Sequence, residues 1–163
     1  WLAALTLAVA APVRAGYDPT SGVEMKLMAR AREDGKPLRG FETLDQQVSI
    51  LAGLEEADQV AFLRATLRDF GRAVEMLDEM VGAWSVGDME TLERVAVAPM
   101  KAETPAAYDA MLTRRNIDWA DQIETLLEGS GTAFIAVGAA HLAGEDSVQT
   151  LLARRGVIAE RMA

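Results

Sequence analysis

An unbroken apolar run at residues 132–137, Thr-Ala-Phe-Ile-Ala-Val, limits the folds open to this chain more than any other feature. Such a run is expected of a strand that is buried on both faces of a sheet. A loop of small residues, 138–144, leads from it into a helix that ends at Gly156, and residues 157–161 then suggest a second strand. Strand, helix and strand in this order predict a right-handed βαβ unit with parallel strands.

Most of the remaining chain has the apolar spacing of helices. Helices are expected at 1–12, 23–34, 43–100 and 104–127. Breaks in the longest of these stretches are expected at Gly53, Gly71, Gly87 and Pro99. A short strand is predicted at 36–42, where Pro37 is tolerated at the first positions. The chain, residues 1–163, is therefore predicted to form a single mixed α/β domain. It is rich in helix, with a short, mainly parallel sheet, a C-terminal βαβ unit and a long helical insertion.

The composition excludes several classes of function. The chain has 163 residues and a net charge of −9, and an acidic protein repels phosphate backbones, so nucleic acid is not expected as a partner. There is no cysteine, which excludes disulfides, thiolate zinc sites and cysteine nucleophiles. His141 is the only histidine, so a metal site built within this chain needs mostly carboxylate ligands around it.

Residues 1–12 form an apolar stretch with two interpretations. Together with Val13-Arg14-Ala15 the stretch imitates a signal peptide, but it lacks an initiating Met and a basic segment. A helix buried within the domain is the alternative that the composition leaves open. Because roughly 20 apolar residues are needed to cross a bilayer, the stretch is too short, and no membrane span is expected in this chain.

Two polar residues interrupt the apolar stripe of the helix predicted at 104–127. Arg115 and Asn116 occupy the turn between Leu112 and Trp119, so both side chains are expected to face inward or toward a cleft. A buried guanidinium needs an acceptor, because leaving it unpaired costs roughly 3–5 kcal/mol. A structural ion pair beneath the helix and a functional arginine both agree with this pattern.

Three further polar residues lie on apolar faces or at an expected sheet edge. Glu24 shares a helix face with apolar residues, and Gln47 lies between two leucines of its own stripe. Glu42 ends the short predicted strand immediately before a helix. A carboxylate in this place either contributes to a site at the edge of the sheet or caps the helix that follows.

His141 follows the apolar run at 132–137 within a loop in which Gly138 permits a tight turn. In open α/β sheets, ligands gather beyond the carboxyl ends of the strands, where this loop is expected to lie. A neutral imidazole in this place is able to bind a metal or to transfer a proton near pH 7. A purely structural histidine is the alternative.

Two motifs resemble the C-terminal signature of the TraB/GumN family: Arg-Asn-x-x-Trp at 115–119 and Val-Gly-Ala-Ala-His-Leu-x-Gly at 137–144. Upstream, Gly-Tyr-Asp-Pro at 16–19 and Gly-Phe-Glu-Thr at 40–43 occur in the order and spacing of the family, so the resemblance spans nearly the whole chain. Members of the family carry two Gly-x-x-His motifs, whereas this sequence has only the second, at 138–141. The resemblance therefore implies that the chain is N-terminally truncated and lacks the segment with the first motif.

The resemblance also implies a function, because the family is similar to the Tiki metalloproteases and to erythromycin esterase. It implies a divalent-metal-dependent hydrolase or peptidase that uses metal-activated water, with manganese or cobalt as the ion and zinc as the alternative. His141 is then a metal ligand or acid/base, Glu42 a ligand or general base, and Arg115 a stabiliser of oxyanion charge. The supporting residues that the resemblance implies around these groups are Gln47, Asn116, Glu24 and Gly138.

A non-catalytic protein on the same fold, which binds haem or a peptide signal, is the competing interpretation. A hydrolase predicts turnover of a peptide or small-molecule substrate, whereas a binding protein predicts spectral or thermal shifts without turnover. By the same resemblance, we expect the protein to lie in the periplasm or outside the cell.

Overall fold

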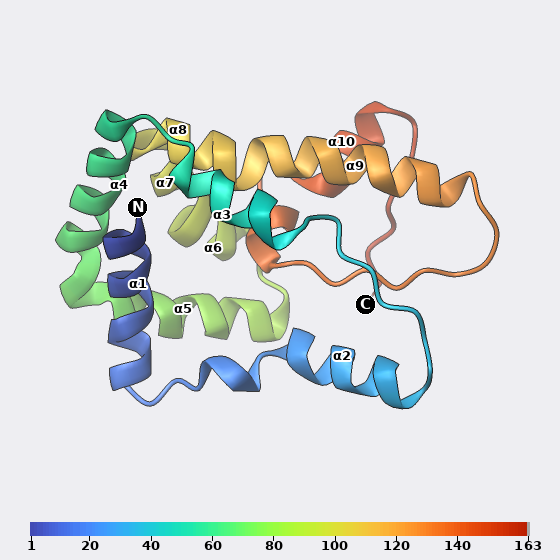
Figure 1. Ribbon diagram of the computed structural model, residues 1–163, viewed down its shortest axis with the longest axis horizontal. Coiled ribbons are helices and arrows are strands. Elements are labelled where there is room, and N and C mark those ends of the chain that lie inside the picture. The colour runs from blue at the N-terminus through green and yellow to red at the C-terminus, as the bar shows by residue number, and fades with distance from the viewer. Residues whose placement is uncertain (163) are drawn as a thin grey trace.

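A computed structural model describes residues 1–162 of the chain, and every regular element in this part is a helix (Figure 1). Most are α-helices, while the label η marks 3-10 helices and two π turns, η3 and η4. In chain order the elements are α1 (Leu2–Arg14), η1 (Pro19–Ser21), α2 (Val23–Glu33), α3 (Leu44–Ala52), α4 (Glu56–Asp69), η2 (Phe70–Arg72), α5 (Ala73–Val86), α6 (Met89–Leu92), η3 (Glu93–Val97), α7 (Ala98–Glu103), α8 (Pro105–Tyr108), η4 (Asp109–Thr113), α9 (Arg114–Leu127), η5 (Ala139–Leu142) and α10 (Val148–Arg154).

The expected α/β fold with a parallel sheet is wrong, because residues 1–162 form helices and no strand. The segments predicted as strands, 36–42, 132–137 and 157–161, have no regular secondary structure. A strand requires a second strand that pairs with its N–H and C=O groups, and apolar composition alone does not supply this partner. Phe134 and Ile158 are 81% and 73% exposed, so the apolar segments that suggested buried strands lie at the surface.

The helix predicted at 104–127 is confirmed, since α8, η4 and α9 follow one another without a break from Pro105 to Leu127. A π turn, η4, interrupts its regular α-helical geometry at Asp109–Thr113. Such a turn contains an additional residue and changes which side chains face the core in the turns that follow. Arg115 lies directly after this change of register, near the start of α9.

The expected breaks in the stretch 43–100 are confirmed at the glycines but not at the proline. Gly53 ends α3, and Gly87 ends α5 in the left-handed conformation at φ 69°. Gly71 lies in η2, between α4 and α5. Pro99, in contrast, lies near the start of α7 directly after the π turn η3, where the helix continues because the distorted turn already departs from the i to i−4 bonding that a proline disrupts.

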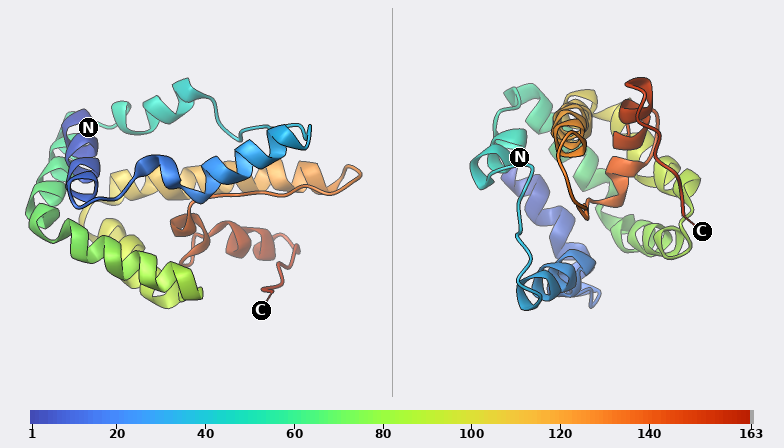
Figure 2. Two further views of the ribbon diagram at one scale, coloured as in Figure 1. Left: turned by 90° about the horizontal axis from the view of Figure 1, so that it is seen from below. Right: turned by 90° about the vertical axis from the view of Figure 1, so that its right-hand side faces the viewer.

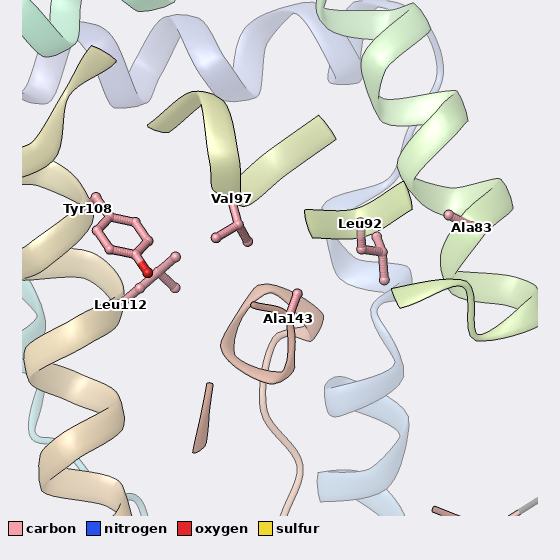
Figure 3. Packing of buried hydrophobic residues seen from close by; sticks show 6 residues of the cluster. All are labelled: Ala83, Leu92, Val97, Tyr108, Leu112 and Ala143. Atoms are coloured by element: carbon pink, nitrogen blue, oxygen red, sulfur yellow. The ribbon is translucent and has the colours of Figure 1, made fainter. Parts of the chain in front are cut away.

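The hydrophobic core consists of two clusters on either side of the loop that holds His141. One cluster connects α5, the two π turns and the loop, and its buried members are Ala83, Leu92, Val97, Tyr108, Leu112 and Ala143 (Figure 3). The other connects α9 with α10 through Trp119, Ala120, Val148 and Leu152. Since Ala143 and Val148 belong to different clusters, the chain following His141 is held against both.

The N-terminal stretch forms a helix that packs within the molecule. α1 contacts α4 and α5, and Ala4 on it is completely buried (Figure 1). In contrast, α2 packs against η1, buries none of its residues and lies apart from α9 (Figure 2). No helix within residues 1–162 combines the length and the apolar composition that crossing a membrane requires.

Candidate functional site

His141 is held at the junction of the two core clusters by a hydrogen bond to Asn116. The imidazole lies on η5 and the residue is 7% exposed, while Asn116 on α9 is 1% exposed. The Asn116 amide nitrogen donates to the backbone carbonyl of Asp146 at 2.7 Å, which leaves its oxygen facing His141 Nδ1 at 2.6 Å. An amide oxygen only accepts, so Nδ1 carries the proton and Nε2 presents its lone pair.

His141 is neutral at physiological pH. Burial lowers its pKa most, the positive charge of Arg115 lowers it further, and the negative charge of Glu42 only partly opposes these effects, so the pKa falls to about 4. A neutral imidazole whose Nδ1–H is held by a neighbour is the form that binds a metal ion through Nε2. His141 is a poor proton acceptor near neutral pH, because with a pKa of about 4 the imidazole becomes protonated only in acid.

Glu42 and Arg115 form a bidentate ion pair next to His141. Arg115 Nε donates to Glu42 Oε1 at 2.7 Å, and Nη2 donates to Oε2 at 2.9 Å. The third guanidinium nitrogen, Nη1, donates to the Met111 carbonyl at 3.0 Å and lies 3.3 Å from His141 Nε2. The two side chains are 8% and 21% exposed, so Arg115 places a positive charge between a carboxylate and an imidazole away from bulk water.

The carboxylate of Glu42 is ionised in this arrangement. Burial raises its pKa, but the hydrogen bonds and charge of Arg115, together with weaker hydrogen bonds from Gln47 and Trp119, outweigh burial and hold the pKa below its ordinary value. Glu42 does not cap α3, because Thr43 is the N-cap residue and forms a capping box with Gln46. The cap expected as one role of Glu42 is therefore wrong, and the carboxylate pairs with Arg115 instead.

Trp119 contacts all three of these groups. Its indole Nε1 donates to Glu42 Oε1 at 3.1 Å, and the ring lies 4.2 Å from the His141 ring and 4.8 Å from the Arg115 guanidinium carbon. Sequence reasoning placed this residue on an apolar stripe and gave it no role. The sequence does indicate the contact with Arg115, because residues four apart on one helix lie side by side.

The helix α9 brings Arg115, Asn116 and Trp119 to one face, and loops bring the others. Glu42 lies in the loop before α3, and this loop is fixed to α9 because Gln122 Nε2 donates to the Phe41 carbonyl at 3.0 Å. Residues 143–147 return the chain from η5 to α10 and supply the carbonyl that holds Asn116. The site is thus built from three segments that are distant in the sequence.

The remaining predicted residues differ in their distance from the site. Gln47, on α3, is among the groups that lower the pKa of Glu42. The backbone carbonyl of Gly138 accepts a hydrogen bond from the backbone N–H of His141 at 2.9 Å. A Cβ atom at position 138 would lie 3.7 Å from the His141 ring, an ordinary contact distance, so the space beside His141 does not require a glycine. Glu24 is exposed on α2, beside Gly22, and the structure does not bring it to the site.

Two side chains of types that are able to bind a metal lie at the site, the carboxylate of Glu42 and the imidazole of His141. No group of three or more His, Cys, Asp and Glu residues suited to a metal ion occurs within residues 1–162. Both candidate ligands also contact Arg115, whose guanidinium lies where they converge. The donor chemistry therefore suits a divalent ion, but the number of donors that these residues bring together does not complete a site.

An apolar pocket adjoins this group of residues and shares Trp119 with it. The pocket is open to solvent, has a volume of about 370 Å³ and lies between α9, α10 and the segments around 135–137 and 159. Its lining includes Ile123, Leu142 and Leu152, and Gln149 is the polar side chain among the lining residues. A ligand held at His141 would thus have apolar surface beside it.

Comparison with known proteins assigns relatives to the chain. A model of the TraB/PrgY/gumN family matches residues 1–161. "Uncharacterized protein YbaP" from Escherichia coli K12 is 24% identical over 152 residues, which cover 93% of this chain and 55% of that protein. Its Shigella flexneri counterpart matches equally. The chain thus spans about half the length of these curated relatives. No solved structure matches.

Proposed function

The chain belongs to the TraB/PrgY/gumN family, and from this premise we propose that it carries part of the active site of a metal-dependent hydrolase acting on peptides or small molecules. Arg115 lies within hydrogen-bonding distance of both Glu42 and His141, and this convergence supports the proposal. These groups come from separate segments and are buried together. Enzymes use such arrangements to hold charged groups away from water, where their electrostatic effect is largest.

His141 is the proposed metal ligand. Its Nδ1–H is held by Asn116, which leaves Nε2 as the atom available for bonding, and its low pKa keeps it unprotonated. Ligand histidines are commonly oriented in this way by a second hydrogen-bond partner. Glu42, ionised and next to it, is the proposed second ligand. A bound ion would supply a water of lowered pKa as the nucleophile.

Arg115 is the proposed stabiliser of negative charge that develops on the substrate. Four of its N–H groups point at Glu42, Met111 and His141, which fixes the orientation of the guanidinium. A charge that is fixed before reaction needs no reorganisation when an oxyanion forms. The same contacts bear on the metal, because the guanidinium already lies against Glu42 and His141 Nε2, the two groups proposed to hold it.

Manganese or cobalt is the proposed ion, with zinc as the alternative, and calorimetric titration of the full-length protein with each metal alone tests this. His141→Ala is expected to abolish binding because it removes the ligand, and Asn116→Ala is expected to lower the affinity about 10–100-fold because ligand orientation contributes to affinity. Leu92→Val, a change in a buried residue of the other core cluster, is the control and should leave binding unchanged. Equal affinities of the wild type and His141→Ala would contradict the proposal.

A second candidate function is ligand binding without catalysis, with haem or a peptide signal as the ligand. The apolar pocket that shares Trp119 with the site favours it, because bound ligands cover such surfaces. Spectral or thermal shifts with haem or peptides, without turnover, are its expected result. Cleavage in a screen of peptide substrates by the full-length protein would remove this candidate.

A periplasmic or extracellular location is proposed together with the hydrolase, and the family resemblance is its support. Fractionation of cells that express the full-length protein tests it. Recovery in the periplasm or medium is expected, whereas recovery only in the cytoplasm would contradict the proposed location without affecting the proposed chemistry.

A further inference from the structure

We infer that Trp119 is a positioning residue that holds Glu42, Arg115 and His141 in one arrangement through its indole ring and its Nε1–H. It contacts each of the three groups in a different way: a hydrogen bond of 3.1 Å to Glu42, a cation–π contact of 4.8 Å with Arg115 and a ring contact of 4.2 Å with His141. Trp119 has no ionisable group, yet it contacts Glu42, Arg115 and His141.

Trp119 helps to hold Glu42 in place, in addition to Arg115 and to the hydrogen bond from Gln122 to Phe41. Glu42 lies in a loop outside the helical hydrogen bonds of α3. Phe41, its neighbour in sequence, stacks on Trp119 with 5.7 Å between ring centroids and 29° between planes. The indole thus contacts two consecutive side chains of the loop, and through them connects the loop to α9.

The ring also keeps water from the ion pair. Trp119 is 5% exposed and covers one side of both Arg115 and His141. Charges interact more strongly where water is excluded, since the effective dielectric constant falls from about 80 toward about 20 or lower. A smaller side chain at this position would admit water between the guanidinium and its partners, and the fixed orientation of Arg115 would be lost.

The effect of Trp119 on catalysis rests on the proposed function, but its effect on the positions of Glu42, Arg115 and His141 can be tested without turnover. Three variants separate the contributions of Trp119: Trp119→Phe keeps a ring without the N–H donor, Trp119→Leu removes both, and Leu152→Ala damages the same apolar cluster without touching the site. The readout is the Nε–H signal of Arg115 in proton–nitrogen NMR spectra of the full chain, assigned by its loss in Arg115→Lys.

The signal is expected to persist, shifted, in Trp119→Phe, to broaden beyond detection in folded Trp119→Leu, and to remain unchanged in Leu152→Ala. Equal loss in Trp119→Leu and Leu152→Ala at matched thermal stability would overturn the inference, because the residue would then act through stability alone. Persistence of an unchanged signal in Trp119→Leu would overturn it as well.

A second measurement uses the intact tryptophan and does not depend on whether Trp119→Leu folds. Glu42→Gln replaces the charged acceptor of the indole by a neutral one. The Nε1–H signal of Trp119 is expected to shift upfield, whereas the signals of Trp1 and Trp84 serve as internal controls and stay in place. An unmoved Trp119 signal would contradict the hydrogen bond on which the inference depends. Failure of metal binding or turnover alone would leave both NMR results, and so this inference, standing.

Discussion

Two polar networks of similar composition meet at Asp146, and they differ in burial. The inner network consists of Glu42, Arg115, Asn116 and His141, whereas the outer network consists of Lys101, Tyr108, Glu145 and Asp146. Each contains carboxylate, cation and ring groups. The Asp146 carbonyl joins them, because it accepts from Asn116 while its side chain accepts from Tyr108 at 2.8 Å and Lys101 at 3.0 Å.

The inner network is expected to determine the chemistry because water does not screen it. The Glu42 side chain is 8% exposed, while Lys101 and Glu145 in the outer network are 42% and 71% exposed. Exposed ion pairs contribute little to stability, whereas breaking a buried pair leaves a charge without water or partner. Charged residues therefore form a fixed electrostatic site in the inner network, whereas Lys101 and Glu145 of the outer network form a solvated ion pair.

The largest expected effect is that of Arg115→Met in the inner network. It leaves the Glu42 carboxylate buried without a counter-charge, so the free energy of unfolding should fall by about 3–5 kcal/mol in urea titrations. Glu42→Gln combined with Arg115→Met removes both charges and should lose less than Arg115→Met alone. A double variant that is as unstable as the sum of the single variants would show that the two residues do not interact.

The pH dependence of stability is the next largest effect. The pKa of His141 is about 4 in the folded chain and 6.5 in its ordinary state. Between these values the unfolded chain binds the additional proton, so stability is lost as the pH falls from about 6.5 toward 4, by about 3 kcal/mol in total. Glu42, with its lowered pKa, adds to the loss at the acid end.

His141→Gln isolates this dependence from that of the other ionisable groups. Urea titrations at pH 7 and pH 4.5 should give a smaller difference in unfolding free energy for the variant than for the wild type. A pH dependence identical in both proteins would show that burial does not keep His141 neutral.

Substitution of Asn116 is expected to have an intermediate effect. Asn116→Ala leaves the His141 Nδ1–H and the Asp146 carbonyl without their partner, at a cost of about 1–3 kcal/mol. Asn116→Asp retains an acceptor for His141 but adds a negative charge, so it should raise the pKa of His141 toward its ordinary value, as an NMR titration would measure. An unchanged pKa in this variant would place Asn116 away from the imidazole in solution.

The smallest effect is expected in the outer network. Lys101→Met removes the cation that pairs with Glu145 and Asp146, yet both the lysine and Glu145 are largely solvated, so the unfolding free energy should change by at most about 1 kcal/mol. A loss as large as that of Arg115→Met in the same urea titration would remove the distinction between the two networks.

Local patterns predicted the parts of the molecule that depend on neighbours in the sequence. The period of apolar residues located the helix from Pro105 to Leu127, and the polar interruption of its stripe located Arg115 and Asn116 as inward-facing residues. His141 was expected in a small-residue loop beyond the carboxyl end of a strand; the loop is present as a short 3-10 turn, but no strand precedes it within residues 1–162.

The strands failed because pairing is not local. The run at 132–137 has the composition of a strand. A strand forms only when a second strand pairs with its backbone, and the sequence pattern does not show which segment would pair with it. The prediction that Glu24 supports the site has a related weakness. Periodicity shows that Glu24 shares a helix face with apolar residues, but it does not show that this face of α2 packs against the rest of the molecule. The role of Trp119 was hidden because a core tryptophan and a positioning tryptophan have the same spacing.

An NMR titration of the imidazole tests the central claim, that a neutral His141 is fixed within a buried ion-pair network, most directly. The chain has one histidine, so the titrating signal is assigned without ambiguity. A pKa of about 4, with nitrogen shifts that place the proton on Nδ1 throughout neutral pH, is the predicted result. A pKa near 6.5 with mixed tautomers would contradict the account, because it would place the imidazole in solvent and away from Arg115 and Asn116.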